Sequence, residues 1–230
     1  MEVDPLNINY LQPALFDLGE VGSGVLELFP KVWGALEKLV DPDARNRRAG
    51  LDCLIELNAA RFSPLVVYLL TTRLQDPDLG IRGEITRILA GVLTLDEKGE
   101  LSPEPVRQIL SYHLSQMQRE HIYKMLELVE ADPIAVTGVV PIFKACHNCG
   151  NYLSEILLDR RESLAIRKQA ARLIGIVGYV DAIPCIDRLI SRLESRVNGQ
   201  QYFPFGSSEN GEEHSLLPIL NSVLALLQAP

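Results

Sequence analysis

The residues best suited to chemistry in this sequence form a Cys-x-x-Cys motif, made by Cys146 and Cys149. A structural zinc site needs four ligands, and no second Cys or His pair lies at ordinary spacing from this motif. A redox dithiol is typical of a motif at a helix N-terminus beside a β-α-β pattern, and the sequence has no such pattern. We therefore interpret the two cysteines as ending one helix and beginning the next, with Asn148, Cys149 and Gly150 as the turn. We expect no bound metal and no cofactor.

Other sequence patterns of catalysis are missing. The chain contains no P-loop, no His-Glu-x-x-His helix and no Gly-x-Ser-x-Gly nucleophile elbow. Its four histidines lie at positions 113, 121, 147 and 214, and none of them is followed by a glutamate. No acid-base pair is indicated by spacing, so we expect a protein that is not an enzyme.

Composition and charge restrict the class of protein. Of the 230 residues, 47% are hydrophobic and 23% charged, which is typical of a globular chain, and the low aromatic content of 6% favours helix. The net charge of −8 argues against nucleic-acid binding. We expect no membrane span, because no run of 18 apolar residues occurs, and the N-terminus does not resemble a signal peptide. With cysteines that form no disulfide framework, these features favour a cytoplasmic protein.

The clearest organisational feature is an internal repeat. The segment 39–43 (Leu-Val-Asp-Pro-Asp) returns 35 residues later as 74–78 (Leu-Gln-Asp-Pro-Asp), and Arg47 returns as Arg82. A third, less complete copy is centred on Arg167. Counted from each arginine, small or apolar residues stand at +3, +6, +7 and +10, which is one face of an α-helix. The repeat therefore predicts helices that begin near each of these arginines and bury the same face.

Turn residues indicate how the helices of one unit are joined. Asp43 and Asp78 are placed to cap the second helix of their units, because a carboxylate accepts from the free amides of a first turn. Pro64 and Pro184 each follow a repeat arginine by 17 positions and are suited to the first turn of another helix. Paired helices that repeat every 30 to 45 residues are typical of an α-solenoid.

The third copy carries a resemblance to a known family. Residues 165–178 (Ala-Ile-Arg-Lys-Gln-Ala-Ala-Arg-Leu-Ile-Gly-Ile-Val-Gly), followed by 181–184 (Asp-Ala-Ile-Pro), closely resemble HEAT repeats, in particular the short bacterial type found in phycobilisome-lyase-like proteins. The resemblance covers 39–93 and 159–196. It implies an all-α fold, an α-α superhelix of about five helix pairs.

The family pattern also implies a ladder between neighbouring repeats. An acidic residue precedes the second helix of each repeat and an arginine lies inside it. The third copy departs from the pattern, because Arg161 stands where the aspartate is expected and Asp159 or Glu162 would substitute. The ladder residues that the resemblance implies are Asp41, Arg47, Asp76, Arg82 and Arg167.

We expect a single HEAT-repeat domain over 1–230, with an irregular middle. Helices are predicted over 25–39, 103–117, 119–131, 134–146, 149–158 and 214–228, and a loop over 94–100. The expected divisions are an N-terminal extension over 1–24, two regular repeats over 25–93, irregular repeats over 94–158, a regular repeat over 159–196, a loop over 197–212 and a capping helix over 213–230.

A set of basic side chains suggests a binding surface. They follow the repeat arginines by one or five positions, away from the buried face, and comprise Arg48, Arg87, Lys168 and Arg172. In HEAT repeats the second helices line the concave surface, so the resemblance implies a basic strip there. We interpret the protein as a non-enzymatic scaffold that binds a protein or peptide, preferably an acidic one, through this surface. The plainer interpretation is a solvated helix face.

Two other functions remain open on the resemblance alone. One is a phycobilin-lyase-like or other enzyme-associated module, and the more remote one is a HEAT-like DNA glycosylase, which the charge of −8 and the lack of aromatic residues in the strip disfavour. Trp33 is expected to pack in the core. Leu217 and Leu226 fall outside the apolar stripe of the last helix, so we expect a monomer or a weak homodimer through that helix.

Overall fold

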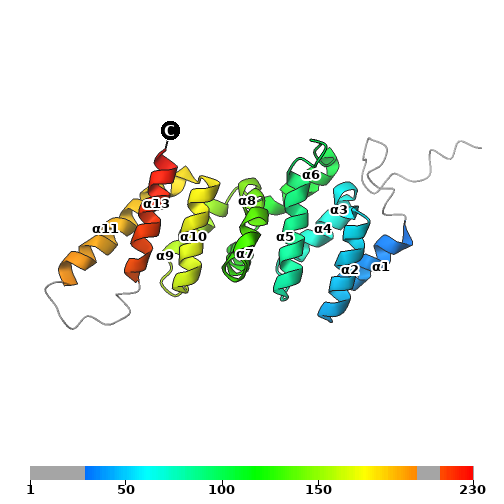
Figure 1. Ribbon diagram of the computed structural model, residues 1–230, viewed down its shortest axis with the longest axis horizontal. Helices are drawn as coiled ribbons and strands as arrows, with labels where there is room; N and C mark the ends of the chain where they lie inside the picture. The colour runs from blue at the N-terminus through cyan, green and yellow to red at the C-terminus, as the bar shows by residue number, and fades with distance from the viewer. Residues whose placement is uncertain (1–28, 201–212, 230) are drawn as a thin grey trace, which may run out of the picture.

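The computed structural model describes residues 29–200 and 213–229, the last five residues of the first range by their backbone only. Within these ranges the chain is helical and contains no strand, which confirms the predicted all-α class for the described residues. The helices lie in a row along the long axis of the molecule and follow the chain order, except that the last helix, over 217–228, lies between those over 164–177 and 183–200 (Figure 1). The expected extension over 1–24 and the loop residues 201–212 lie outside the described residues.

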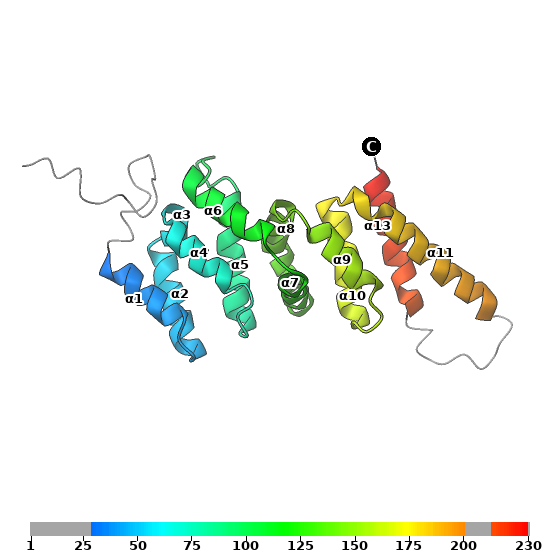
Figure 2. The ribbon, with the colours of Figure 1, turned by 180° about the vertical axis from the view of Figure 1, so that it is seen from behind.

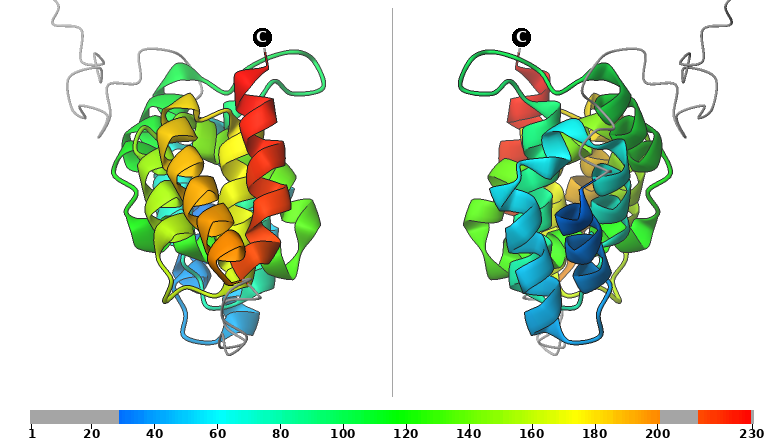
Figure 3. Two further views of the ribbon diagram at one scale, coloured as in Figure 1. Left: turned by 90° about the vertical axis from the view of Figure 1, so that its left-hand side faces the viewer. Right: turned by 90° about the vertical axis from the view of Figure 1, so that its right-hand side faces the viewer.

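Most helices lie in two layers, which Figures 1 and 2 show from opposite sides and Figure 3 shows from both ends. The first layer contains α1 (Pro30–Leu39), α4 (Pro64–Thr72), α6 (Glu104–Ser115), α9 (Cys149–Leu158) and α11 (Ile183–Gln200). The second contains α2 (Ala44–Glu56), α5 (Leu79–Leu93), α10 (Leu164–Val177) and α13 (Leu217–Gln228), and we call it the second-helix layer. Helix α11 continues through 197–200, where a loop was expected, so that prediction was wrong for these four positions.

The middle of the chain departs from this alternation. Helix α7 (Arg119–Ala131) packs against α9 and α10, whereas α8 (Val136–Ala145) packs along α5. The contact between α8 and α5 is close at Gly138, where an added Cβ would lie 3.4 Å from the Cα of Arg87. The helix expected over 134–146 is divided, because a 3-10 turn, η3 (Pro133–Ala135), precedes α8. Helix α8 is therefore an additional helix beside α5, outside the alternation of the two layers.

The helix starts follow the predicted capping chemistry. Asp43 Oδ1 accepts the backbone N–H of Arg45 at 2.9 Å, and Asp78 Oδ1 accepts that of Ile81 at 2.9 Å. Pro64 is the first residue of α4, where its missing N–H would have had no intrahelical partner. The two aspartates satisfy amides that the first turn of a helix leaves unpaired, and Pro64 lacks such an amide, so these residues mark where α2, α4 and α5 begin.

Loss of the cap on α5 is expected to be measurable. We expect Asp78→Ala to lower the free energy of unfolding by about 1 kcal/mol. Asp78→Asn should retain most of that stability, because the amide oxygen can accept the same hydrogen bond from Ile81. Urea denaturation of the three proteins measures this. An equal loss in both variants would mean that the negative charge of Asp78, and not its hydrogen bond, stabilises the start of α5.

A continuous apolar core runs between the layers. Trp33 does not belong to it, contrary to the prediction, because 49% of its surface is exposed and no described helix precedes α1 to cover that face. Leu226 is exposed on α13, as its position outside the stripe predicted. No described helix has both the length and the apolarity that a membrane crossing requires. Buried side chains occur in this core from one end of the molecule to the other, and they include Leu39, Leu70, Leu89, Leu114, Phe143, Leu153, Ile174, Leu193 and Leu220.

Candidate protein-binding surface

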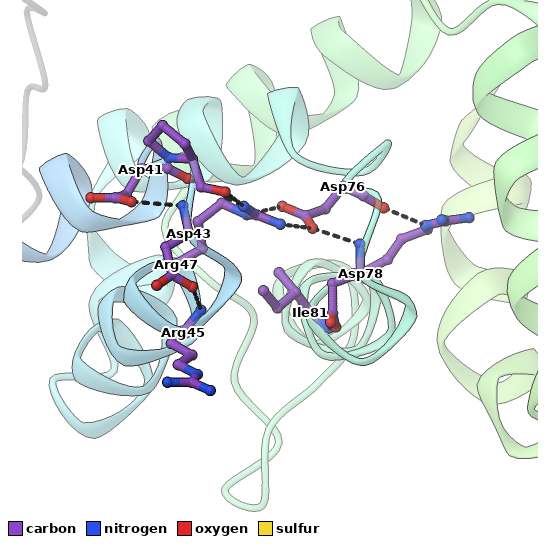
Figure 4. A network of polar contacts seen from close by, with 9 residues as sticks. Asp41, Asp43, Arg45, Arg47, Asp76, Asp78 and Ile81 are labelled. Atoms are coloured by element: carbon purple, nitrogen blue, oxygen red, sulfur yellow. Dashed lines mark hydrogen bonds and ion pairs between the residues drawn. The ribbon is translucent and has the colours of Figure 1, made fainter.

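Arg47 joins the first two helix pairs through a buried ion pair (Figure 4). Its Nε and Nη2 donate to the two carboxylate oxygens of Asp76 at 2.8 and 2.9 Å, and the side chains are 7% and 0% exposed. Its Nη1 donates to the carbonyl oxygens of Asp41 and Pro42 at 3.2 and 2.8 Å. The hydrogen bond to Asp76 raises the pKa of Arg47 above its ordinary value. The guanidinium thus contacts its own turn and the next one.

The contact between Arg47 and Asp76 links neighbouring units, and within its own unit the arginine meets only the backbone of the aspartate. The Asp41 carboxylate accepts the backbone N–H of Asp43 at 2.7 Å, and Arg47 meets only the carbonyl oxygen of Asp41. Similarly, Arg82 Nε donates to the carbonyl oxygen of Asp76 at 3.0 Å. The geometric reason is that the Asp76 carboxylate faces the preceding unit, toward Arg47.

The same arrangement continues along the chain. Arg82 Nη1 donates to the carbonyl oxygen of Lys124 at 2.8 Å and lies 3.3 Å from a carboxylate oxygen of Glu127, both on α7. Arg167 Nη2 lies 2.8 Å from Glu213, which directly precedes the last helices, while its Nε donates to the carbonyl oxygen of Leu157 at 2.9 Å. Each arginine is nearly buried and reaches a carboxylate further along the chain.

Arg119, at the start of α7, belongs to the same series of arginines, although the sequence did not lead us to predict it. Its Nη2 lies 3.0 Å from Asp159 and 2.7 Å from Glu162, in the turn before α10. Arg119 follows Arg82 by 37 positions, and the residues at +3, +6, +7 and +10 are apolar, which is the signal that could have found it. Those residues, all buried, are Ile122, Met125, Leu126 and Val129. We call Arg47, Arg82, Arg119 and Arg167 the arginine relay.

Two of the four predicted binding residues are paired with acids on their own helices. Arg48 Nε lies 3.3 Å from Asp52 on α2, and Arg87 forms an ion pair with Glu84 on α5. The hydrogen bond from Arg87 lowers the pKa of Glu84, and the charge of Arg48 adds to the effect. Arg48 and Arg87 therefore both interact with Glu84, and the nearby carboxylates partly neutralise their positive charge.

Lys168 and Arg172 lie elsewhere, in a groove between α10 and the end of α7. This groove has a volume of about 490 Å³ and is also lined by Glu130 and Gln169. Gln169 Nε2 donates to Glu130 at 2.7 Å, so the groove carries both signs of charge. In chain order, α8 lies between α5, which carries Arg87, and α10, which carries Lys168 and Arg172. It packs on α5 at Gly138. The four residues form two separate groups and not the expected single strip.

Another cleft lies where α2 and α5 end. It has a volume of about 860 Å³ and lies between the short helix α3 (Ala59–Phe62) and the loop 94–103. Arg61 Nη2 lies 2.8 Å from Asp96 and fixes this loop on α3. A hydrogen bond from the backbone N–H of Glu100 lowers the pKa of Asp96. The cleft is lined by apolar side chains and by charges of both signs, which include Ile55, Phe62, Ile88, Leu95, the basic Arg61, Arg87 and Lys98, and the acidic Asp96, Glu97 and Glu100.

The remaining chemical motif lies away from these grooves. Cys146 ends α8 and Cys149 begins α9, and both thiols are buried and form no disulfide. Over the part of the chain that the structure describes, no three His, Cys, Asp or Glu side chains are placed to hold a metal ion.

Comparisons with known proteins add little to this geometry. No family model matches the sequence, and no curated protein matches it. A search of solved structures returns the crystal structure of an engineered protein, 13% identical, over 85% of this chain and 98% of that one. Its TM-score of 0.24 is too low to support any inference. These comparisons assign no family.

Proposed function

We propose that the chain is a HEAT-like helical-repeat scaffold, without enzymatic activity, that binds a protein or peptide through the second-helix layer. The observation that carries this proposal is the arginine relay. Arg47, Arg82 and Arg167 are buried and Arg119 is half-buried, and each links one part of the helix row to the next, so the layer is a preorganised surface that loses little conformational entropy on binding. The repeated register of Arg47, Arg82 and Arg167 supports the HEAT-like interpretation.

The partner surface that we propose combines the cleft at the ends of α2 and α5 with the groove on α10. Arg87 lines the cleft and its side chain is 65% exposed, so a partner carboxylate can replace Glu84 as its counterion. Arg172 supplies the second positive group, beside the apolar Pro133 and Leu164. At Arg87 and Arg172 this surface, which also carries acidic side chains, would receive the carboxylates of an acidic segment with apolar side chains, and the association would weaken with salt.

Charge reversal tests the proposal. We expect the double variant Arg87→Glu/Arg172→Glu to lose a partner that wild-type protein captures from lysate of the native host, as read by mass spectrometry. The same partner should be retained by Arg188→Glu, which reverses an exposed arginine on α11 in the other layer. Circular dichroism would first establish that all three proteins are folded. A partner retained equally by the double variant would contradict the proposed surface.

A further inference from the structure

Cys146 and Cys149 lie together at the junction between α8 and α9. Cys146 is 2% exposed and Cys149 is fully buried. The Cys149 thiol contacts the Cys146 sulfur, and the backbone N–H groups of Asn148 and Cys149 face it, while the Cys149 N–H also donates to the Cys146 carbonyl oxygen at 3.4 Å. The Cys146 sulfur therefore occupies the N-terminal end of α9, a helix of ten residues, where free amides favour a negative charge.

The two thiols are chemically different. The hydrogen bonds that Cys146 accepts, first of all from Cys149, lower the pKa of Cys146 below its ordinary value. Burial raises the pKa of Cys149. A thiol of lowered pKa, beside a second thiol that burial keeps protonated, is the arrangement of a dithiol in which the first sulfur reacts and the second resolves.

Tyr179 fixes this pair against the rest of the fold. Its hydroxyl donates to the carbonyl oxygen of Phe143 in the last turn of α8 at 2.5 Å and also contacts the Cys149 thiol. Its ring lies on the first turn of α9, since a Cβ at Gly150 would be 2.9 Å from the ring. Tyr179 follows the left-handed C-cap Gly178 of α10, so the thiols lie where α8, α9 and α10 meet.

We propose that Cys146 and Cys149 are a redox-modification site that forms an intrachain disulfide with hydrogen peroxide. The Cys146 thiolate attacks one peroxide oxygen, the O–O bond breaks, and hydroxide leaves and is protonated to water. The resulting sulfenic acid on Cys146 is attacked by the Cys149 sulfur, whose proton leaves with the displaced oxygen as a second water. Two thiols are oxidised to one disulfide, and one peroxide is reduced to two waters.

Access to the buried sulfurs comes through the turn between the helices. His147 and Asn148, the two residues between the cysteines, are exposed, so we expect a local opening of this turn, at the edge of the core, to uncover Cys146. A disulfide draws the two sulfurs to about 2.05 Å, and Cys146 can then no longer accept the amides of α9 as a thiolate. Oxidation would thus alter the junction between α8 and the α9–α10 pair. This inference does not depend on the proposed function.

Thiol counting in the full chain tests the site without any substitution. Reduced protein would be treated with hydrogen peroxide, unfolded, alkylated with N-ethylmaleimide and mapped by peptide mass. We expect the number of alkylated cysteines to fall from four to two, with Cys146 and Cys149 linked in one peptide pair and both recovered by dithiothreitol. Cys53 and Cys185, which are half-buried and lie apart from this motif, are internal controls.

Two variants identify the attacking sulfur. In Cys149→Ser, peroxide should leave a sulfenic acid at Cys146 that dimedone labels, whereas in Cys146→Ser position 149 should remain unlabelled. The proposal is overturned if Cys53 or Cys185 is oxidised in wild-type protein while Cys146 and Cys149 both remain alkylatable. Labelling of position 149 in Cys146→Ser at the same rate would overturn the assignment of Cys146 as the attacking residue.

Discussion

Gly50→Ala is expected to lower the free energy of unfolding by about 3 kcal/mol, although alanine is a far better helix former than glycine. The reason is the approach of α2 to α1. A Cβ on Gly50 would lie 2.5 Å from the carbonyl oxygen of Ala35 and 2.9 Å from the backbone nitrogen of Leu39. Backbone atoms cannot move aside as a flexible side chain can, so the two helices must separate and lose core contacts.

Gly91→Ala is the matched control, because it makes the same substitution inside α5. No described atom lies within 4 Å of the added methyl group, so only helix propensity changes. We expect this variant to be more stable than wild type by about 1 kcal/mol. Equilibrium denaturation in urea measures both effects. The opposite signs are the decisive feature, and a Gly50→Ala protein as stable as Gly91→Ala would disprove the close packing of α1 on α2.

Arg47→Ala is expected to destabilise the protein by about 3 to 5 kcal/mol. Asp76, fully buried, would lose both hydrogen bonds from the guanidinium and keep the backbone N–H of Asp78 as its donor. A buried carboxylate without a counterion is costly, and this penalty exceeds the loss of the contact itself. The neighbouring exposed Arg45→Ala should change stability by less than about 0.5 kcal/mol.

A double replacement distinguishes the cost of a buried charge from the loss of packing. Arg47→Met/Asp76→Leu removes both charges and keeps apolar volume, so we expect it to be more stable than Arg47→Ala. Thermal and urea unfolding of the four proteins would be compared at one pH and salt concentration. If Arg47→Ala cost no more than Arg45→Ala, Asp76 would have to be hydrated in solution, contrary to its burial in the structure.

Local features of the fold could be predicted from the sequence because they depend on neighbouring residues. Asp43 and Asp78 cap the helices that they were expected to cap, and Pro64 begins α4. The predicted helices 119–131 and 149–158 coincide with α7 and α9. Capping, proline geometry and a 3.6-residue apolar period act within a few residues, so a single sequence contains them.

Pairings between units could not be predicted, because they depend on how helices pack. The resemblance implied only that neighbouring units are linked, and the contact of Arg47 with Asp76, 29 positions away, depends on how the two units pack. Glu213 could not be assigned to Arg167, since the two are 46 positions apart and the intervening spacing is irregular. The predicted basic strip was likewise drawn from register alone, which says nothing about α8. The partner and the redox behaviour of the cysteines stay predictions.

The contacts of the arginine relay all run in the same direction along the chain. This direction determines which charge a partly unfolded molecule exposes at each end. Every guanidinium reaches a carboxylate nearer the C-terminus, so detaching α1 and α2 uncovers the Asp76 carboxylate, while detaching the last helices uncovers the Arg167 guanidinium. A chain frayed at one end therefore presents the charge opposite to that of a chain frayed at the other. Such ends are complementary head to tail, and head-to-tail contacts that do not close a ring propagate into open filaments.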